Sequence, residues 1–319
     1  MNEVTVIGAG AWGTALAIQA ARAGNNVRLW ARDPARAATM AATRENPRLP
    51  GVRLPDSVST IDDLAQTRGI VVLATPMQHL RAVLSRLPRN GPLVICAKGV
   101  ETGTLRLPLE IADATHPGTP AGVLTGPNFA HEIAAGLPAA AVMAATDAAL
   151  RDAVVAALAT PAFRLYGNDD PVGAQVGGAA KNVVAIAAGA VIGAGLGENA
   201  RAALITRGLA ELARLAVALG GRSETVMGLS GLGDLLLTCT GPASRNFSLG
   251  VALGRGEALA DLLAARSAVT EGVATAPALL QRAAGVDMPV CAAVAALLAG
   301  RTTLTQAMTD LLARPRRDE

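Results

Sequence analysis

A glycine-rich turn near the start of the chain constrains the fold more than any other feature. The hexapeptide GAGAWG begins at Gly8, directly after the short β-type run Glu3–Ile7, and opens a segment of helical character that reaches Ala23. In such a pattern Gly8 permits a tight turn, Gly10 lets the backbone approach a pyrophosphate and Gly13 lets the helix pack on the strand. The free N–H groups at the helix start attract an anion. The segment predicts a dinucleotide-binding strand–turn–helix, and the alternative is an ordinary glycine turn.

The residues after the second expected strand bear on which dinucleotide binds. Asn26–Trp30 is followed by Ala31, Arg32 and Asp33. An acidic residue here holds the ribose 2′-OH of NAD, whereas an arginine accommodates the 2′-phosphate of NADP. Because both residue types are present, we expect the cofactor to be NAD or NADP, with NADPH somewhat favoured.

The first half of the chain alternates short β-branched runs with helical segments. Several of these runs are apolar throughout, as in strands that are covered on both faces. This alternation indicates a parallel, doubly wound α/β sheet of the Rossmann-like class. The expected strands are Glu3–Ile7, Asn26–Trp30, Ile70–Ala74, Leu93–Ala97, Gly122–Thr125, Ala139–Ala145 and Phe163–Tyr166.

After about Gly173 the sequence reads as helices, with no convincing strand between them. We therefore predict a dinucleotide-binding Rossmann-like domain over residues 1–176 and an all-helical substrate-binding domain over 177–319. The expected helices are Gln175–Gly193, Asn199–Leu219, Arg245–Leu253, Leu259–Arg266, Ala274–Ala284 and Val290–Leu298.

Composition argues against several other classes of protein. The three cysteines, Cys96, Cys239 and Cys291, are far apart and the histidines share no ligand spacing, so neither a disulfide framework nor a metal site is expected. The formal net charge is only +3 and the basic residues are scattered, which does not indicate a nucleic-acid partner. The longest apolar stretch, Val183–Gly197, is short and broken by glycines, so a buried helix is expected rather than membrane insertion. We expect a cytoplasmic protein without a signal peptide.

Lys181 is the candidate for proton transfer. Hydride transfer from a nicotinamide to a ketone needs a proton donor for the developing alkoxide. Lys181 lies in an otherwise apolar helical stretch, where a lysine is rarely buried without a role. Desolvation would lower its pKa, and its positive charge would stabilise an alkoxide. The alternative is a lysine that snorkels from the edge of a helix.

A second cluster combines a glycine turn with Asp234 and, ten residues later, Ser244, Arg245 and Asn246. Ser-Arg-Asn at a helix start suits a phosphate, because the guanidinium binds two oxygens and the backbone amides point at a third. The alternatives are a helix cap for Ser244 and an exposed loop acid for Asp234.

A third cluster follows two expected strands of the first domain, where doubly wound sheets hold their ligands. Lys98 comes directly after Leu93–Ala97, while Gly126 and Asn128 come directly after Gly122–Thr125. Lys98 is then either a surface turn residue or a cation that faces the cofactor and the substrate.

Taken together, these segments resemble bacterial NAD(P)-dependent sn-glycerol-3-phosphate dehydrogenase over nearly the whole chain. The matching strings are GAGAWGTALA from Gly8, AKGVE from Ala97, GPNFAHEIAAGLP from Gly126, AAKNVVAIAAG from Ala179, NARAALITRGLAE from Asn199, GLSGLGDLLLTCTGPASRN from Gly228 and VTEGVATA from Val269.

The resemblance implies reversible reduction of dihydroxyacetone phosphate to sn-glycerol 3-phosphate, which supplies glycerophospholipid synthesis, by a homodimer. It implies that Lys181 transfers the proton and that Arg245 contacts both ligands. The implied substrate contacts are Lys98, Gly126, Asn128, Lys181, Asp234, Ser244, Arg245 and Asn246. The implied cofactor contacts, beside the glycines Gly8, Gly10 and Gly13, are Ala11, Trp12, Arg32, Lys98, Ala130, Arg245, Val269 and Glu271.

The chain departs from the family pattern at several positions. Asn128 stands where serine or threonine is common, Ala11 replaces a frequent serine and Arg48 occupies a position where tyrosine is usual. Phe247 and Ser248 replace a basic pair. No catalytic group is lost, but the strength and selectivity of binding depend on these positions.

Two other functions are compatible with parts of this pattern. A two-domain dehydrogenase that acts on a 3-hydroxy acid or phosphogluconate would share the glycine turn and a Lys-Asn helix, but would lack the Asp234 segment and Ser-Arg-Asn. A non-catalytic dinucleotide sensor would keep the glycine turn and need neither Lys181 nor Asp234.

Overall fold

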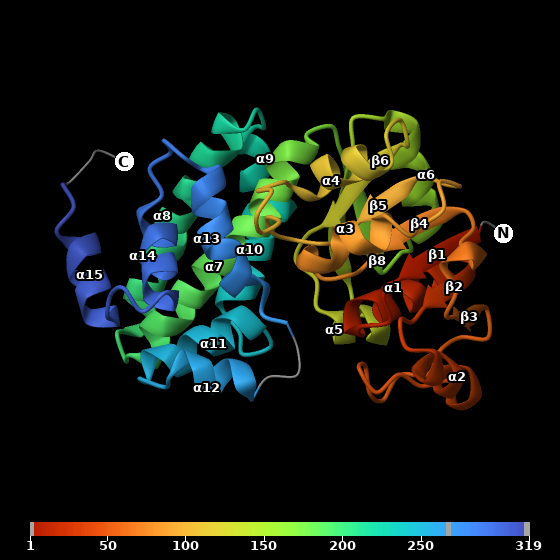
Figure 1. The fold of residues 1–319 in the computed structure, drawn as a ribbon, viewed down its shortest axis with the longest axis horizontal. Helices are drawn as coiled ribbons and strands as arrows, with labels where there is room; N and C mark the ends of the chain where they lie inside the picture. Colours follow the sequence, from red (N-terminus) through yellow and green to blue (C-terminus); the bar gives the residue numbers. More distant parts are fainter. Residues whose placement is uncertain (1–2, 266–268, 316–319) are drawn as a thin grey trace. The chain divides into compact units, whose positions relative to one another are not determined.

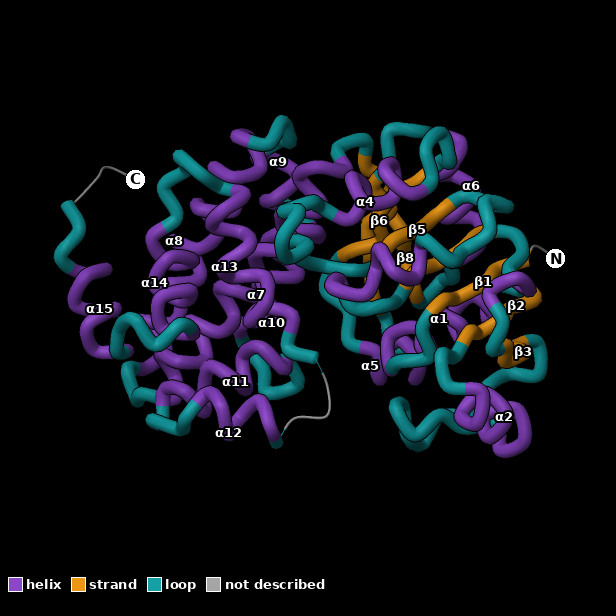
Figure 2. The backbone as a smooth tube through the Cα atoms, viewed as in Figure 1, coloured by secondary structure: helices purple, strands orange, loops and turns teal. Residues whose placement is uncertain are grey.

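The computed structural model describes residues 3–265 and 269–315 and divides the chain into two compact units. Unit 1 comprises Met1–Lys98 and Arg106–Gln175, and unit 2 comprises Gly99–Leu105 and Val176–Glu319. All strands named below belong to unit 1, whereas the described part of unit 2 is helical (Figures 1 and 2).

Unit 1 is built on an eight-stranded sheet with the order β3-β2-β1-β4-β5-β6-β7-β8. The predicted α/β class is confirmed, and each of the seven expected strands forms, with ends that differ by at most two residues. The strands are β1 (Glu3–Ile7), β2 (Asn26–Trp30), β3 (Val58–Ile61), β4 (Ile70–Leu73), β5 (Leu93–Ile95), β6 (Ala121–Thr125), β7 (Ala139–Ala144) and β8 (Phe163–Asn168). The strand that the prediction missed, β3, lies at the sheet edge and has two polar, less buried residues between its buried ends, so it lacks the apolar run of the central strands.

The expectation of a fully parallel sheet is wrong at one pair. All neighbouring strands pair in parallel except β6 and β7, which are antiparallel, for example through Leu124 and Met143. The helix between them, α5 (Ala130–Ala135), has six residues and is about 9 Å long. It is too short to return the chain along a six-residue strand of about 20 Å, as a parallel crossover requires.

The order of the strands places a topological switch between β1 and β4. The chain leaves β1 toward β2 on one side, and β4 pairs on the other side, so the carboxyl ends of β1 and β4 lie next to each other. In open α/β sheets, ligands bind outside the carboxyl ends of the strands at such a point. The glycine turn that follows β1 is therefore at the expected ligand edge of the sheet.

The helices of unit 1 form two groups in contact with the sheet. α1 packs against α5 and α6, while α3 packs against α4. α1 is buried over eight consecutive residues, which its alanines and Gly13 allow because small side chains let a helix approach the strands closely. The remaining elements are α1 (Ala11–Arg22), α2 (Pro34–Thr43), η1 (Leu64–Gln66), η2 (Met77–His79), α3 (Leu80–Leu84), α4 (Pro108–Thr115) and α6 (Ala148–Leu158).

Unit 2 contains all six predicted helices, although the expected end at Arg266 lies outside the described residues. Three helical segments were not predicted: α9, α15 and the joined pair η3 and α10. The helices are α7 (Pro171–Gly193), α8 (Gly197–Ala218), α9 (Ser223–Met227), η3 (Leu229–Gly233), α10 (Asp234–Cys239), α11 (Arg245–Gly254), α12 (Leu259–Ala264), α13 (Glu271–Arg282), α14 (Pro289–Leu298) and α15 (Leu304–Leu312).

Helix α7 forms the apolar centre of unit 2. Within the described ranges it is the one helix whose length and composition would allow it to cross a membrane. However, 83% of its most apolar window is buried inside the protein, as in the core helix of a globular domain. The prediction of a buried helix over Val183–Gly197 agrees with this burial up to the helix end at Gly193.

Candidate active site

The glycine turn has the geometry that a bound pyrophosphate requires. Gly8 has a φ of +114°, and a Cβ there would lie 2.8 Å from the carbonyl oxygen of Ala74 at the end of β4. A Cβ on Gly13 would lie 1.9 Å from the Gly8 carbonyl oxygen. Gly10, in contrast, is exposed and a Cβ there would meet no atom of the described residues within 4 Å. Gly8 and Gly13 are therefore needed for packing, and Gly10 leaves open space at the start of α1, so the residues fit a dinucleotide.

Trp12, the second residue of α1, is partly buried and packs against the core cluster that includes Cys96. Burial raises the pKa of the Cys96 thiol to about 12. Burial also raises the pKa of Cys239 to about 12. All three cysteines are buried and free, so these thiols remain protonated and unreactive near neutral pH.

The two charged residues after β2 have different roles in the structure. The Asp33 carboxylate caps α2 by accepting a hydrogen bond from the Ala35 backbone N–H at 3.0 Å. Arg32 is exposed. The acidic residue that left the choice of dinucleotide open is thus engaged in capping a helix, which sequence reasoning did not foresee.

Asn46, which the sequence did not single out, fastens a loop to the glycine turn. Its Nδ2 donates to the carbonyl oxygen of Ala9 at 3.1 Å and to the hydroxyl of Thr14 at 2.6 Å. Its Oδ1 accepts from the backbone N–H of Arg48 at 3.0 Å. Asn46 is almost completely buried, and its three hydrogen bonds bring Arg48, a departure from the family pattern, close in the fold to the dinucleotide turn.

Three predicted residues of unit 1 come together at the carboxyl ends of β5 and β6. The Lys98 Nζ lies 3.4 Å from the carbonyl oxygen of Gly126, and the Asn128 Nδ2 donates to the carbonyl oxygen of Ala140 at 3.1 Å. The Oδ1 of Asn128 is buried and meets no donor among the described residues. This oxygen can accept a hydrogen bond from a ligand hydroxyl, so Asn128 offers a side-chain contact in spite of its departure from serine or threonine. Ala130 is the first residue of the neighbouring α5.

Lys181 and Asp234 form a buried ion pair in unit 2. The Lys181 Nζ donates to the Asp234 Oδ1 and, at 2.9 Å, to the Thr238 hydroxyl. Lys181 is 7% exposed and Asp234 is 1% exposed. The Lys181 side chain therefore does not snorkel into solvent, and Asp234 is not a solvated loop acid. The Asp234 carboxylate and the Thr238 hydroxyl both accept hydrogen bonds from the Lys181 Nζ, so the buried ammonium is paired.

The segment that carries Asp234 is helical and closely packed. The glycine turn expected there is the π-helical turn η3, which continues directly into α10. A Cβ on Gly231 would lie 2.0 Å from the Val226 carbonyl oxygen, and a Cβ on Gly177 would lie 2.6 Å from that of Ser230. The glycines of this turn serve close packing against α9 and α7. Asp234 opens α10, so Thr238, one turn later, lies on the same face; that spacing is the signal by which Thr238 could have been found.

The Ser-Arg-Asn string begins a helix as predicted. Ser244 caps α11 by accepting a hydrogen bond from the Phe247 backbone N–H at 3.2 Å, and Arg245 is the first helical residue. Asn246 is bound at both ends of its amide, because its Nδ2 donates to the Asn182 Oδ1 at 2.9 Å and its Oδ1 accepts from the Gly272 N–H at 3.0 Å.

The other predicted residues of unit 2 lie at the start of α13. Glu271 is the first residue of this helix. Val269 is 47% exposed and precedes the helix by two residues.

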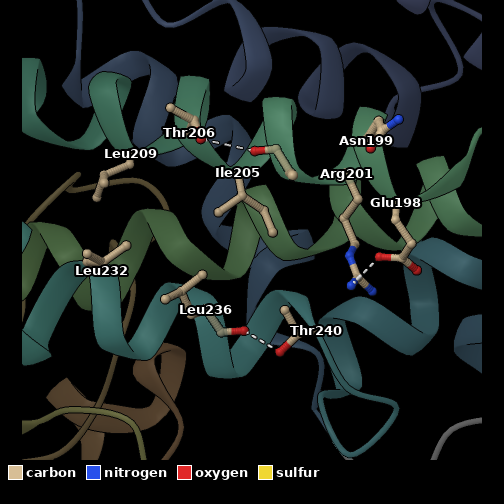
Figure 3. A pocket seen from close by; sticks show the side chains of 10 residues that line it. Glu198, Asn199, Arg201, Ile205, Thr206, Leu209, Leu232, Leu236 and Thr240 are labelled. Atoms are coloured by element: carbon tan, nitrogen blue, oxygen red, sulfur yellow. Dashed lines mark hydrogen bonds and ion pairs between the residues drawn. The ribbon is translucent and has the colours of Figure 1, made fainter.

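A separate groove of about 420 Å³ lies between α8 and the η3–α10 segment (Figure 3). Figure 3 shows Ile205 and Leu209 of α8 facing Leu232 and Leu236 across it. Neither Lys181 nor any other predicted site residue lines this groove. The groove is lined by Glu198, Asn199, Arg201, Ala202, Ile205, Thr206, Leu209, Leu232, Leu236 and Thr240.

Comparison with known proteins shows to which family this chain belongs. Residues 3–151 match the family described as NAD-dependent glycerol-3-phosphate dehydrogenase N-terminus, and residues 170–309 match the corresponding C-terminus. The chain belongs to the NAD-dependent glycerol-3-phosphate dehydrogenase family. The resemblance noted from the sequence is thereby confirmed.

Individual family members are similar over their full length. The chain is 60% identical to glycerol-3-phosphate dehydrogenase [NAD(P)+] of Acidiphilium cryptum, over 99% of this chain and 98% of that protein. It is 52% identical to the protein of the same name from Gluconobacter oxydans, over 98% and 97%. The crystal structure of glycerol-3-phosphate dehydrogenase from Coxiella burnetii superposes with a TM-score of 0.93, at 35% identity over 98% of this chain and 99% of that chain. These matches do not favour a 3-hydroxy acid dehydrogenase or a non-catalytic sensor.

Proposed function

We propose that this family member reduces dihydroxyacetone phosphate reversibly to sn-glycerol 3-phosphate with NADH or NADPH. The observation that carries the proposal is the buried contact of Lys181 with Asp234 and Thr238 in a chain that also has a complete dinucleotide turn. Purified protein should oxidise reduced nicotinamide when dihydroxyacetone phosphate is added. Binding of both reduced cofactors without any turnover would instead support a dinucleotide sensor.

The nicotinamide, when bound, supplies the hydride, and the chain supplies the proton. The Lys181 ammonium donates a proton to the oxygen that becomes the new hydroxyl, and in the reverse direction the neutral amine accepts it. Asp234 and Thr238 hold the Nζ in place and keep it charged before transfer. Burial of the pair strengthens these electrostatic interactions, because water does not screen them.

The start of α11 is the proposed phosphate site. Its first-turn N–H groups and the Arg245 guanidinium are both suited to a phosphate. We expect Arg245→Ala to raise the KM for dihydroxyacetone phosphate about 10- to 100-fold, since a hydrogen bond to a charged group contributes about 1.5–3 kcal/mol. Steady-state kinetics at saturating NADH measure this. Arg255→Ala, at the opposite end of the same helix, is the matched control and should leave the KM unchanged; equal effects of the two variants would exclude the assignment.

NADPH is the proposed preferred cofactor, although NADH is also used. Arg32 is exposed at the end of β2, and one oxygen of the Asp33 carboxylate caps α2. We expect Arg32→Ala to raise the KM for NADPH about tenfold and to leave the KM for NADH almost unchanged, because only NADPH carries the 2′-phosphate. Parallel titrations of both cofactors test this, with NADH as the internal control. A similar increase in the KM for both cofactors would show that Arg32 does not bind the 2′-phosphate.

The remaining assignments follow from the family. Residues 1–176 are proposed to bind the dinucleotide and 177–319 the substrate, with Lys98, Gly126 and Asn128 adding substrate contacts. We also propose a homodimer in the cytoplasm, which light scattering and cell fractionation can test. Proposed cofactor contacts are Gly8, Gly10, Ala11, Trp12, Gly13, Arg32, Lys98, Ala130, Arg245, Val269 and Glu271, and the other proposed substrate contacts are Lys181, Asp234, Ser244, Arg245 and Asn246.

A further inference from the structure

Helices α7 and α11 of unit 2 pack backbone against backbone through four glycines (Figure 1). On α7, a Cβ on Gly189 or Gly193 would lie 2.1 Å from a carbonyl oxygen of α11. On α11, a Cβ on Gly250 or Gly254 would lie 2.0 or 2.3 Å from a carbonyl oxygen of α7. Each helix thus carries two glycines four residues apart, on one face, and these pack on backbone atoms of the other helix.

The contacts fix the register of the two helices. Asn182 lies opposite Asn246, Ile186 opposite Gly250 and Ala190 opposite Gly254. Each step advances four residues on both helices, so α7 and α11 run parallel along their shared length. The residue before Asn182 and the residue before Asn246 therefore lie at the same end of the paired helices. These residues are Lys181, the proposed proton donor, and Arg245, the proposed phosphate ligand.

The Asn246 side chain connects α7, α11 and α13 at the start of α11. Both ends of its side-chain amide are hydrogen-bonded within the protein, to Asn182 of α7 and to the backbone N–H of Gly272 at the start of α13. A Cβ on Gly272 would lie 2.7 Å from both the Asn182 carbonyl oxygen and the Asn246 Oδ1. Three helices therefore meet around Asn246 with no room for a further carbon atom.

We propose that Gly189, Gly193, Gly250 and Gly254, together with the Asn182–Asn246 hydrogen bond, act as positioning residues that hold the phosphate-binding start of α11 against the part of α7 that carries Lys181. This inference rests on the proposed function. A methyl group at any of the four glycines has to move α11 away from α7 by about 1 Å to restore ordinary van der Waals contact. A displacement of about 1 Å at a reacting centre costs on the order of 100-fold in rate.

Gly254→Ala tests the proposal most directly, because Gly254 lies more than two helical turns from Arg245 and is not a proposed ligand-contact residue. We expect the KM for dihydroxyacetone phosphate and the inhibition constant of sn-glycerol 3-phosphate to rise about 10- to 100-fold. The KM for NADH should not change. These constants do not depend on the fraction of enzyme that is folded, so a loss of stability alone would leave them unaltered and reduce only the apparent kcat.

Gly208→Ala of α8 is the matched control. A Cβ there would lie 2.7 Å from a methyl group of Val184. It would therefore overlap α7 as well, but through a side chain and not through the backbone. It should cost stability without changing the substrate KM. Asn182→Ala is the second test variant: it removes the acceptor of the Asn246 amide without steric overlap and should raise the substrate KM several-fold.

The outcomes separate the positioning role from the proposed function. Wild-type protein that fails to reduce dihydroxyacetone phosphate would refute the function itself. Wild-type protein that turns over normally, with an unchanged substrate KM in folded Gly254→Ala and Asn182→Ala, would refute the positioning role alone. If Gly254→Ala does not fold, an unchanged KM in Asn182→Ala refutes it, and an increase in that variant supports it.

Discussion

Replacing Lys181 by alanine is expected to lower kcat by about 10²- to 10⁴-fold while the dissociation constant for NADH stays unchanged. The factor is the usual contribution of a positioned general acid. Cofactor binding should survive because the dinucleotide turn belongs to unit 1, whereas Lys181 is in the buried centre of unit 2. Steady-state kinetics and calorimetric titration with NADH measure the two quantities on the same preparation.

The control must account for the charge that this substitution leaves behind. Removing the ammonium takes one partner away from the carboxylate of Asp234, which is 1% exposed, and breaking a buried ion pair in this way costs about 3–5 kcal/mol. The double variant Lys181→Met with Asp234→Asn removes both charges and nearly keeps the side-chain volume, so it should fold better than Lys181→Ala and remain inactive. Turnover near the wild-type rate in either variant would remove Lys181 from the proposed role.

Two glycines of the dinucleotide turn are expected to have different roles, one in packing and one in cofactor binding. Gly13→Ala should lower the Tm, because its Cβ would overlap the Gly8 carbonyl oxygen and overpacking costs about 1–3 kcal/mol. Each kcal/mol corresponds to a Tm shift of about 2–4 °C. Gly10→Ala should change stability by no more than about 1 kcal/mol, as for other N-cap substitutions. It should still weaken NADH binding at least tenfold, because the methyl group projects into the space left for the pyrophosphate.

Differential scanning calorimetry and NADH titration of both variants provide the measurement, with each variant as the other's control. The opposite pattern, in which Gly13→Ala keeps its Tm and Gly10→Ala binds NADH as tightly as the wild type, would contradict the proposed position of the dinucleotide. Equal losses in both variants would mean that Gly10 also serves the packing of unit 1.

Elements with a strong local signal could be predicted from sequence. β1, the glycine turn and α1 form as expected because the apolar run, the three glycines and the alanine-rich helix agree with one another over about twenty residues. β3 was missed because an edge strand with polar residues lacks such a signal. The sequence predicts only a glycine turn where η3 forms, since the packing of α7 and α9 against its glycines has no local signal.

By itself, the sequence determined seven of the eight strands, six of the helices of unit 2, the presence of a dinucleotide turn, and the residue types available for proton transfer and phosphate binding. These depend on local periodicity and on the backbone freedom of particular glycines. Only the tertiary structure decided that Lys181 pairs with Asp234, 53 residues away, and that α7 and α11 run in register. These relations come from packing and hydrogen bonds between distant segments, and no local pattern in the chain specifies them.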